Sequence, residues 1–556
     1  MKKPLAIGID DFKELINKSY YYVDKTLLLK ELIDNQGKVS LFTRPRRFGK
    51  SLTLSMIRTF FETGIDNQSY FSNLKIMSAG RKYTDMMGQY PVIDLSLKSA
   101  RQPTFDMAYG SLIDELAKEF DRHSYLAGSD ALNQEEQSRF EKLMLRKGTD
   151  IEYAKSLSFL SRCLEKHHRQ KVIILIDEYD VPLEHAYFAG YYQEMVSFIR
   201  SLLESALKTN PSLDFSVITG CLRISRESIF TGLNNLEIFS VLNHSYAEYF
   251  GFDETEVRQM LSFYSIEEKY GEIRQWYDGY RFGDTDTYNP WSVINYVKTA
   301  ASTPTSLPRP YWANTSSNNI IRELVEHADL TVKQEIELLI EGGTIHKPVH
   351  EDITYEDIYK TQDNLWNFLF FTGYLKNVRE CLEEDTIFLT MAIPNTEIRY
   401  IYKNTILDWF HETIKNQDRS SLYRTILNAD CSHFAEIVSG FLMESISFYD
   451  FAENYYHDFL TGLLQGFPGY IILSNRESGD GRPDIILKSP SLKKTAILME
   501  LKIANSIGDM DAACERALKQ IEDRNYQASL YEEGYRSFMK YGISFYKKEC
   551  AVKLAL

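Results

Sequence analysis

The stretch that decides the fold reads Val39-Ser-Leu-Phe-Thr-Arg-Pro-Arg-Arg-Phe-Gly-Lys-Ser51 and continues into an amphipathic run that ends at Phe61. Its first five residues are typical of a buried strand, and the part from Ser51 to Phe61 has the periodicity of a helix. Backbone N–H groups at the start of such a helix bind anions. The stretch therefore predicts a phosphate-binding loop in which Lys50 reaches the β- and γ-phosphates of a nucleotide and the Ser51 hydroxyl binds Mg²⁺.

The loop departs from the general GxxxxGK[ST] pattern, because Arg44 stands where the first glycine is expected. A Gly-Lys-Ser turn alone is a weak signal, since a helix can begin this way without any ligand. The arginines of the loop are either extra cations around a triphosphate or a nucleic-acid backbone, or a solvated basic loop. On the first interpretation we predict nucleotide contacts from Arg46, Arg47 and Gly49.

A second apolar run, Val172–Ile176, leads directly into Asp177-Glu178-Tyr-Asp180. This is the Walker B arrangement, in which Asp177 would hold Mg²⁺ and Glu178 would polarise an attacking water. A buried strand that ends in a solvated acidic turn is the simpler alternative. Both motifs in one block of alternating strands and helices favour ATP and Mg²⁺ as cofactors.

A third run, Phe215–Thr219, is followed by two arginines. Thr219 at the tip of this strand is a candidate sensor of the γ-phosphate. Arg223 or Arg226 is a candidate arginine finger or sensor, although arginines on a surface helix are usually only solvated.

Strands separated by helices predict an α/β fold in which helices cover both faces of a parallel sheet. We expect a P-loop core at residues 1–242, a mostly helical lid or connector at 243–430, and a smaller α/β domain at 431–556. The strands expected in the core and in the last domain are Val39–Thr43, Tyr90–Leu95, Val172–Ile176, Phe215–Thr219, Leu236–Leu242, Tyr470–Leu473, Asp484–Leu487 and Thr495–Leu501.

The last domain carries a second set of charged residues. Asp484 precedes an apolar strand, and the next strand ends in Glu500-Leu-Lys502. If the two strands pair as a hairpin, Asp484 lies beside Glu500, and two convergent carboxylates bind a hard cation such as Mg²⁺. Lys502 shares a strand face with Glu500 and would either position the attacking water or stabilise charge at a reacting phosphate. Glu453 on the preceding helix would add a third carboxylate; an ordinary α/β domain with charged strand ends is the alternative.

Several motifs together resemble the divergent AAA-ATPase-like family, with a C-terminal domain that resembles PD-(D/E)XK nucleases. The segments that carry the resemblance are Tyr22-Val-Asp-Lys-Thr26, Arg44-Pro-Arg-Arg-Phe-Gly-Lys-Ser51, Asp177-Glu-Tyr-Asp180, Ser228-Ile-Phe-Thr-Gly-Leu-Asn-Asn235, Trp276-Tyr-Asp-Gly-Tyr280, Tyr288-Asn-Pro-Trp291, Tyr456-His457 and Asn475-Arg-Glu-Ser-Gly-Asp-Gly-Arg-Pro-Asp484. The resemblance implies ATP binding and a nuclease-like fold, and in this family an arginine in place of the first loop glycine is usual. Related ATPases complete their sites with a neighbouring copy, which makes a homo-oligomer plausible.

Composition limits the remaining choices. The net charge of −15 argues against a protein that coats nucleic acid non-specifically, but the basic stretches at Arg44–Lys50 and Arg482–Lys502 could meet phosphates locally. The six scattered cysteines are expected to be free thiols, with no zinc site among them. His346 and His350 are expected in a loop without metal, because Pro348 breaks the helix that would align them. No apolar run is long enough for a membrane span or a signal peptide, so we expect a cytoplasmic protein.

The function expected from these observations is ATP binding, with hydrolysis, coupled to a metal-dependent nuclease-like domain that acts on nucleic acid, either DNA or RNA. The alternative is an ATP-dependent switch or scaffold whose nuclease-like domain is inactive and only binds nucleic acid or a protein partner. A third interpretation is a phosphate-binding loop that holds ATP without turnover.

Overall fold

The structure is a computed structural model that describes residues 2–223, 229–230, 234–314, 330–351, 354–358, 360–416, 418–444, 453–474 and 483–555. The chain forms two compact units, one of Met1–Ser316 with Thr344–Tyr400 and one of Ser317–Gly343 with Ile401–Leu556. The three-segment division expected from the sequence stays a prediction. None of the described helices is both long and apolar enough to cross a membrane.

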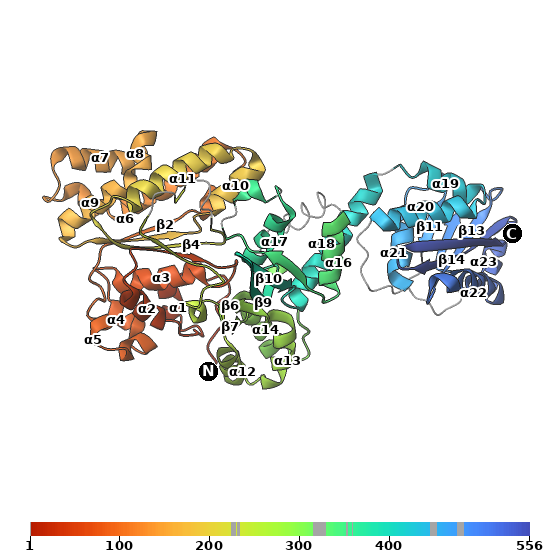
Figure 1. Ribbon diagram of the computed structural model, residues 1–556, viewed down its shortest axis with the longest axis horizontal. Coiled ribbons are helices and arrows are strands. Elements are labelled where there is room, and N and C mark those ends of the chain that lie inside the picture. The colour runs from red at the N-terminus through yellow and green to blue at the C-terminus, as the bar shows by residue number, and fades with distance from the viewer. Residues whose placement is uncertain are drawn as a thin grey trace. The chain divides into compact units, whose positions relative to one another are not determined.

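A parallel sheet of order β2-β3-β4-β1-β5 forms the centre of the first unit. Its strands are β1 (Val39–Thr43), β2 (Val92–Ser96), β3 (Val172–Asp177), β4 (Leu213–Gly220) and β5 (Leu236–Phe239). Figure 1 shows helices on both sides of this sheet. Every residue of β1 and β3 is buried, and burial on both faces explains why most of these residues are apolar. The predicted α/β fold and all five predicted strands are confirmed.

The helices that cover this sheet fall into two groups (Figure 1), with α3 on one side and α6, α9 and α11 on the other. Their bounds are α1 (Phe12–Asn17), α2 (Leu27–Asn35), α3 (Lys50–Phe61), α4 (Asn67–Phe71), α5 (Arg81–Thr84), α6 (Phe105–Arg122), α7 (Gln134–Met144), α8 (Asp150–Ala154), α9 (Ser156–His168), α10 (Val181–Ala189) and α11 (Tyr192–Leu207).

The rest of the first unit combines helices with two small antiparallel sheets, β6–β7 and β8-β10-β9. Its elements are α12 (Glu254–Tyr264), α13 (Tyr270–Tyr277), β6 (Tyr280–Phe282), β7 (Thr285–Thr287), α14 (Pro290–Ser302), β8 (Ile345–Pro348), α17 (Gln362–Phe371), β9 (Lys376–Glu383) and β10 (Thr386–Ala392). Asp253 and Glu256 form a capping box at the start of α12, and the Asn289 side chain caps α14.

The sequence analysis missed the sheet β8-β10-β9. Strand β9 is mostly exposed and carries charged residues on both faces, so it lacks the apolar alternation that identifies a strand. The prediction of a loop around His346 is wrong, because this residue lies in β8. Pro348 fits at the end of β8, because an edge strand does not need every N–H group.

The second unit contains a mixed sheet of order β11-β12-β13-β14-β15, in which only β13 and β14 run parallel among the described pairs. Its elements are α16 (Leu330–Ile340), α18 (Thr396–Asn416, which begins in the first unit), α19 (Ser420–Leu427), α20 (Cys431–Glu444), α21 (Glu453–Leu464), β11 (Ile471–Ser474), β12 (Ile485–Lys488), β13 (Ala496–Ile503), α22 (Met510–Asp523), α23 (Gln527–Glu533), β14 (Phe538–Tyr546) and β15 (Glu549–Ala555). The three strands predicted here are β11, β12 and β13.

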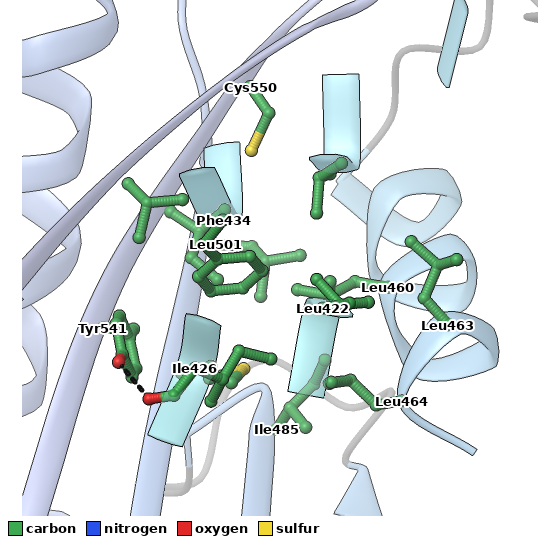
Figure 2. Packing of buried hydrophobic residues seen from close by; sticks show 14 of the residues in the cluster. Leu422, Ile426, Phe434, Leu460, Leu463, Leu464, Ile485, Leu501, Tyr541 and Cys550 are labelled. Carbon is green, nitrogen blue, oxygen red and sulfur yellow. Dashed lines mark hydrogen bonds between the residues drawn. The ribbon is translucent and has the colours of Figure 1, made fainter. Parts of the chain in front are cut away.

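One face of this sheet forms the main core of the unit (Figure 2). Ile485 and Leu501 point from β12 and β13 toward leucines of α19 and α21, and the Tyr541 hydroxyl donates a 2.7 Å hydrogen bond to the Ile426 carbonyl. Because neighbouring residues of a strand point to opposite faces, Glu500 and Lys502 lie on the face that α22 covers. The core therefore decides on which side of the sheet the charged residues lie.

Candidate nucleotide and metal sites

The candidate nucleotide site lies at the carboxyl edge of the parallel sheet. The strands β1, β3 and β4 are neighbours there, so the phosphate-binding loop, Asp177 and Thr219 meet at one place. Gly49 is the N-cap residue of α3 and has φ +84°, a left-handed conformation that glycine adopts without steric cost. The free N–H groups at the start of α3 face this edge and can bind an anion.

Asp177 is held by hydroxyl groups on both sides. Ser51 Oγ donates to Asp177 Oδ2 at 2.7 Å, and Thr219 Oγ1 donates to Asp177 Oδ1 at 2.6 Å. The structure thus brings together the three residues that the sequence analysis assigned to the metal and to the sensor. A hydroxyl and a carboxylate in contact are oxygen ligands of the kind that Mg²⁺ uses beside a nucleotide, so these residues fit the cofactor.

Lys98 completes this site, and the sequence analysis missed it. Its ammonium group lies 2.7 Å from Ser51 Oγ, 3.1 Å from Asp177 Oδ2 and 3.2 Å from Asp10 Oδ2. Burial lowers the pKa of Lys98, but the carboxylates of Asp177 and Glu178 outweigh this effect and raise the pKa above its ordinary value. One signal could have identified Lys98. It comes two residues after β2, and β2 is the strand beside β3, which ends in Asp177. The ammonium group shows that the Ser51–Asp177 pair accommodates a cation.

The side chain of Lys50 bends back toward the loop that precedes α3. Its ammonium group donates to the carbonyl oxygens of Arg44 at 2.9 Å and Pro45 at 3.0 Å, and lies 3.6 Å from Cys221 Sγ. These carbonyls hold the lysine, which is buried, at the edge where a phosphate would bind.

Glu178 and Asp180 have different surroundings. Glu178 is half-buried and has φ +53°, a strained conformation for a residue with a side chain and one that clusters at functional sites. Asp180 is buried and accepts hydrogen bonds from the backbone N–H groups of Cys221 at 2.7 Å and Leu222 at 3.0 Å. Burial raises the pKa of Asp180 to about 6. Asp180 therefore organises the segment after β4, whereas Glu178 is the carboxylate of this pair that is open to solvent.

Arg44 is fully buried, and the prediction of a solvated loop or of a phosphate contact is wrong for this residue. Its guanidinium donates to the Phe239 carbonyl at 2.6 Å and lies 5.1 Å from the ring centres of both Phe250 and Phe282. Burial lowers the pKa of Arg44 to about 9. Arg44 thus connects the loop to the end of β5 and to the segments that carry the two rings. A buried side chain therefore stands at the position where the general loop pattern has a glycine.

The other arginines of the nucleotide site also have partners. Arg46 forms an ion pair with Glu184 of α10, and the guanidinium of Arg47 lies 4.3 Å from the ring centre of Trp291. Arg223 lies 3.7 Å from Glu351. Arg226 lies outside the described residues. Nucleotide contacts by Arg46, Arg47 and Arg223 stay predictions.

The two aromatic motifs around Tyr280 and Trp291 pack on the loop. The ring of Phe48 lies 5.0 Å from that of Tyr280 and 5.2 Å from that of Phe282. Together with the Arg47–Trp291 contact, these rings connect the phosphate-binding loop to the elements that follow the parallel sheet.

The second candidate site lies at the start of the β12–β13 pair. The register places Ile485 opposite Met499, and therefore Asp484 next to Glu500, as predicted. The Leu501 N–H donates to Asp484 Oδ2 at 2.8 Å, and the Asp484 N–H donates to Glu500 Oε2 at 3.4 Å. Lys502 Nζ lies 3.4 Å from Glu500 Oε1. The structure brings all three predicted residues together.

Glu500 is almost completely buried, with 1% exposure. Burial and then the charge of Asp484 raise the pKa of Glu500 to about 7, against the opposing effect of Lys502. Two carboxyl groups that resist joint ionisation are stabilised by a divalent cation between them. The donor set therefore fits Mg²⁺, although the side chain of Glu453 lies outside the described residues.

His457 of α21 is a further residue at this site. It is buried, and its Nε2–H donates to the Asp484 carbonyl at 3.1 Å. The sequence analysis noted Tyr456-His457 only as part of the family resemblance and gave this histidine no role. The bond fixes the backbone of Asp484 and so its carboxylate.

The lysines of the β12–β13 turn lie away from the carboxylates. Asp484 precedes β12 and Lys488 ends it, so the turn from residue 489 to 495 is at the other end of the hairpin. Lys488 forms an ion pair with Glu533 at 2.6 Å. The expected basic cluster from Arg482 to Lys502 is therefore divided along the hairpin, and Arg482 itself lies outside the described residues.

Comparison with known proteins supports both halves of the resemblance. Residues 6–230 match the family model described as "Predicted AAA-ATPase", and residues 451–554 match the model of the PD-(D/E)XK nuclease superfamily. A protein of Azotobacter chroococcum mcd 1, described as "Uncharacterized protein in vnfD 5'region", is 27% identical over 331 residues. That match covers 58% of this chain and 56% of the relative, so the chain spans little more than half of the relative's length.

Proposed function

We propose that this chain, with an N-terminal segment similar to AAA-ATPases and a C-terminal segment similar to PD-(D/E)XK nucleases, hydrolyses ATP and uses it to control metal-dependent cleavage of nucleic acid. The observation that carries the proposal is the meeting of the phosphate-binding loop, Asp177 and Thr219 at one sheet edge. The division into a core at 1–242, a connector at 243–430 and a nuclease-like domain at 431–556 is part of the proposal.

At the first site, the N–H groups of the loop and the ammonium group of Lys50 would bind the phosphates of ATP. Ser51 and Asp177 would hold Mg²⁺, which neutralises phosphate charge when bound. Thr219 keeps Asp177 oriented through its hydrogen bond. Glu178 would orient the attacking water and take its proton, because its carboxylate is adjacent to Asp177 and is half-exposed.

ATP hydrolysis by the purified chain tests this part. Glu178→Gln should keep nucleotide binding but lower the rate of phosphate release by about a hundredfold or more, the usual effect of losing a general base. Glu204→Gln, at an exposed carboxylate of α11, is the matched control and should leave the rate unchanged. Unchanged phosphate release by Glu178→Gln would favour a site that binds ATP without turnover.

At the second site, Asp484 and Glu500 would hold Mg²⁺, which activates water and stabilises charge at a phosphodiester when bound. Lys502 lies beside Glu500 and would stabilise the negative charge that develops on the phosphate. His457 would act by positioning, because it contacts the backbone of Asp484. The substrate class is nucleic acid, with DNA and RNA as the two arms of the test.

A cleavage assay with Mg²⁺, ATP and a panel of single- and double-stranded DNA and RNA tests the second part. Glu500→Ala should abolish cleavage, whereas Glu515→Gln, at an exposed carboxylate of α22, should not change it. Cleavage that persists in Glu500→Ala contradicts the proposed site.

A second candidate function is an ATP-dependent switch or scaffold that binds nucleic acid or a protein without cutting. The burial of Glu500 and its contact with Lys502 favour it, because both restrict access to the carboxylate. Nucleic-acid binding that is retained by the wild type and by Glu500→Ala, with no cleavage by either, would support this function.

A further inference from the structure

A cluster of metal-ligating side chains lies on the sheet β8-β10-β9, apart from both sites described above. It consists of His346, Cys381 and Glu383, whose ligand atoms all lie within 4.8 Å of one another. Among the described residues, this is the group of three or more His, Cys, Asp or Glu side chains whose ligand atoms lie so close together. The sequence gives no sign of it, because His346 lies in β8, more than thirty residues before the two other residues in β9.

The register of the sheet explains why these side chains meet. His346 of β8 is paired with Thr390 of β10, and Cys381 of β9 is paired with Phe388 of β10. Because residues two apart on a strand share a face, Thr390 and Phe388 lie on the same face as the cluster. Glu383 shares this face with Cys381 and borders the tight β9–β10 turn. The three ligands therefore lie on the two edge strands, β8 and β9, and the hydrogen-bonded backbone of the sheet keeps them close together.

The distances suit one small ion. His346 Nε2 lies 2.9 Å from Glu383 Oε1, and Cys381 Sγ lies 3.6 Å from the same oxygen. A tetrahedral zinc ion separates such nitrogen, sulfur and oxygen ligands by about 3.2 to 3.7 Å. The exposed side chains of His346 (42%) and Glu383 (52%) can make the small rotations required.

The imidazole ring of His346 is already oriented as a ligand. Its plane stacks on the ring of Phe388, with centres 5.1 Å apart and an interplanar angle of 14°. Its other nitrogen, Nδ1, lies 3.3 Å from Thr390 Oγ1. A hydrogen bond to the second ring nitrogen is what fixes the orientation of metal-ligating histidines, so Nε2 is directed at the cluster.

We propose that His346, Cys381 and Glu383 form a zinc site with an open fourth position. A thiolate with an imidazole selects zinc over magnesium, which separates this site from the two all-oxygen sites. Binding forms a Zn–S bond and releases the thiol proton of Cys381 to solvent, with no change of oxidation state. The ion joins the two edge strands β8 and β9 across β10, and water takes the fourth position.

Cobalt titration of the full chain, freed of metal with a chelator and kept reduced, tests the proposal. Co²⁺ is expected to produce the charge-transfer absorption of a cobalt–thiolate bond with one ion at this site, and Zn²⁺ then removes this absorption. Cys381→Ser should lose this absorption, and His346→Asn and Glu383→Gln should weaken binding strongly. Thr390→Val should weaken it by about tenfold, because it removes only the support of the histidine.

His433→Asn is the matched control, because His433 forms a surface pair with Asp430 at 2.8 Å but belongs to no such cluster within the part of the chain that the structure describes. It should bind Co²⁺ like the wild type. Thermal unfolding with and without Zn²⁺ gives a second measurement. Zn²⁺ should raise the melting temperature of the wild type but not that of Cys381→Ser. The proposal is overturned if the thiolate absorption is missing in the wild type or equally strong in Cys381→Ser, whichever result the ATPase and nuclease assays give.

Discussion

Lys98 Nζ lies 2.7 Å from Ser51 Oγ and 3.1 Å from Asp177 Oδ2. The ammonium group thus contacts the two oxygen atoms to which we assign the magnesium ion of the nucleotide. A lysine and a divalent cation cannot share these ligands, because like charges at such distances repel strongly. At the scale of residues, the proposed mechanism therefore requires Lys98 to move when the metal–nucleotide complex binds.

Lys98→Met is expected to tighten binding of the Mg²⁺–ADP complex by roughly three- to tenfold, or about 1 kcal/mol. The reason is that the metal no longer displaces an ammonium group from Asp177. Isothermal titration calorimetry on both proteins measures the difference. Lys98→Arg keeps the charge and should bind like the wild type, whereas weaker binding by Lys98→Met would mean that Lys98 contacts the phosphates.

Glu397 is a buried carboxyl group at the start of α18. It accepts hydrogen bonds from Ser292 Oγ at 2.8 and 2.9 Å and from the Trp312 N–H at 2.9 Å. Burial raises the pKa of Glu397 from 4.5 to about 7, despite these hydrogen bonds. Glu397 therefore keeps its proton in the folded protein up to about pH 7, whereas in the unfolded chain it loses the proton near pH 4.5.

Because the folded-state pKa of Glu397 is the higher one, its contribution to stability is complete below pH 4.5 and is lost as the pH rises to about 7. This loss is about 3 kcal/mol. Glu397→Gln keeps the acceptor for Trp312 but cannot ionise, so its free energy of unfolding should fall less over this range. Denaturant unfolding at several pH values measures the two slopes, and equal slopes would contradict the prediction.

At the scale of elements, the close approach of α22 to β14 depends on Gly542. This residue is the neighbour of Glu500 in the β13–β14 register. A Cβ atom there would overlap the carbonyl oxygen of Cys514 in α22 and crowd Leu518. The helix covers the sheet face that carries Glu500 and Lys502, so its distance from the sheet affects the second site.

Gly542→Ala is expected to lower the free energy of unfolding by about 2 kcal/mol, because a methyl group must push the helix away from the strand. Gly440→Ala in α20 is the matched control, since a Cβ atom there meets nothing within 4 Å. It should be neutral or stabilise the protein by up to about 1 kcal/mol. Denaturant unfolding of the two variants measures both changes, and equal stability would contradict the packing argument.

The elements themselves were predictable to different degrees. Strands β1, β3 and β4 were found because burial on both faces favours short runs rich in apolar residues. Strands β8 and β9 were not found, because an exposed edge strand can carry almost any side chain. The cluster of His346, Cys381 and Glu383 on β8-β10-β9 was missed for the same reason: His346 and Cys381 become neighbours only through the register with β10.

At the scale of the whole molecule, the two proposed phosphate-handling sites belong to one chain but to different compact units. We expect ATP binding at the first to gate cleavage at the second. Lys50→Ala should abolish ATP binding and also lower nucleic-acid cleavage, or remove its dependence on ATP. Unchanged cleavage in Lys50→Ala would show that the sites act independently.

The reverse measurement is the control for this coupling. Glu500→Ala should lose cleavage but still bind and hydrolyse ATP, because the first site takes no ligand from the second unit in the proposed mechanism. Parallel assays of both variants separate a coupled protein from one that carries two unrelated activities.

The sequence by itself determined the α/β core, the meeting of the loop after β1 with Asp177, and the pairing of Asp484 with Glu500. The physical reason is that apolar runs specify buried strands, and polar residues at their ends then meet at a known edge. Only the tertiary structure decided that Arg44 is buried between aromatic rings, that Lys98 contacts Ser51 and Asp177, and that His346 meets Cys381. These contacts join segments distant in the chain, and no local pattern records which side chains such packing brings together.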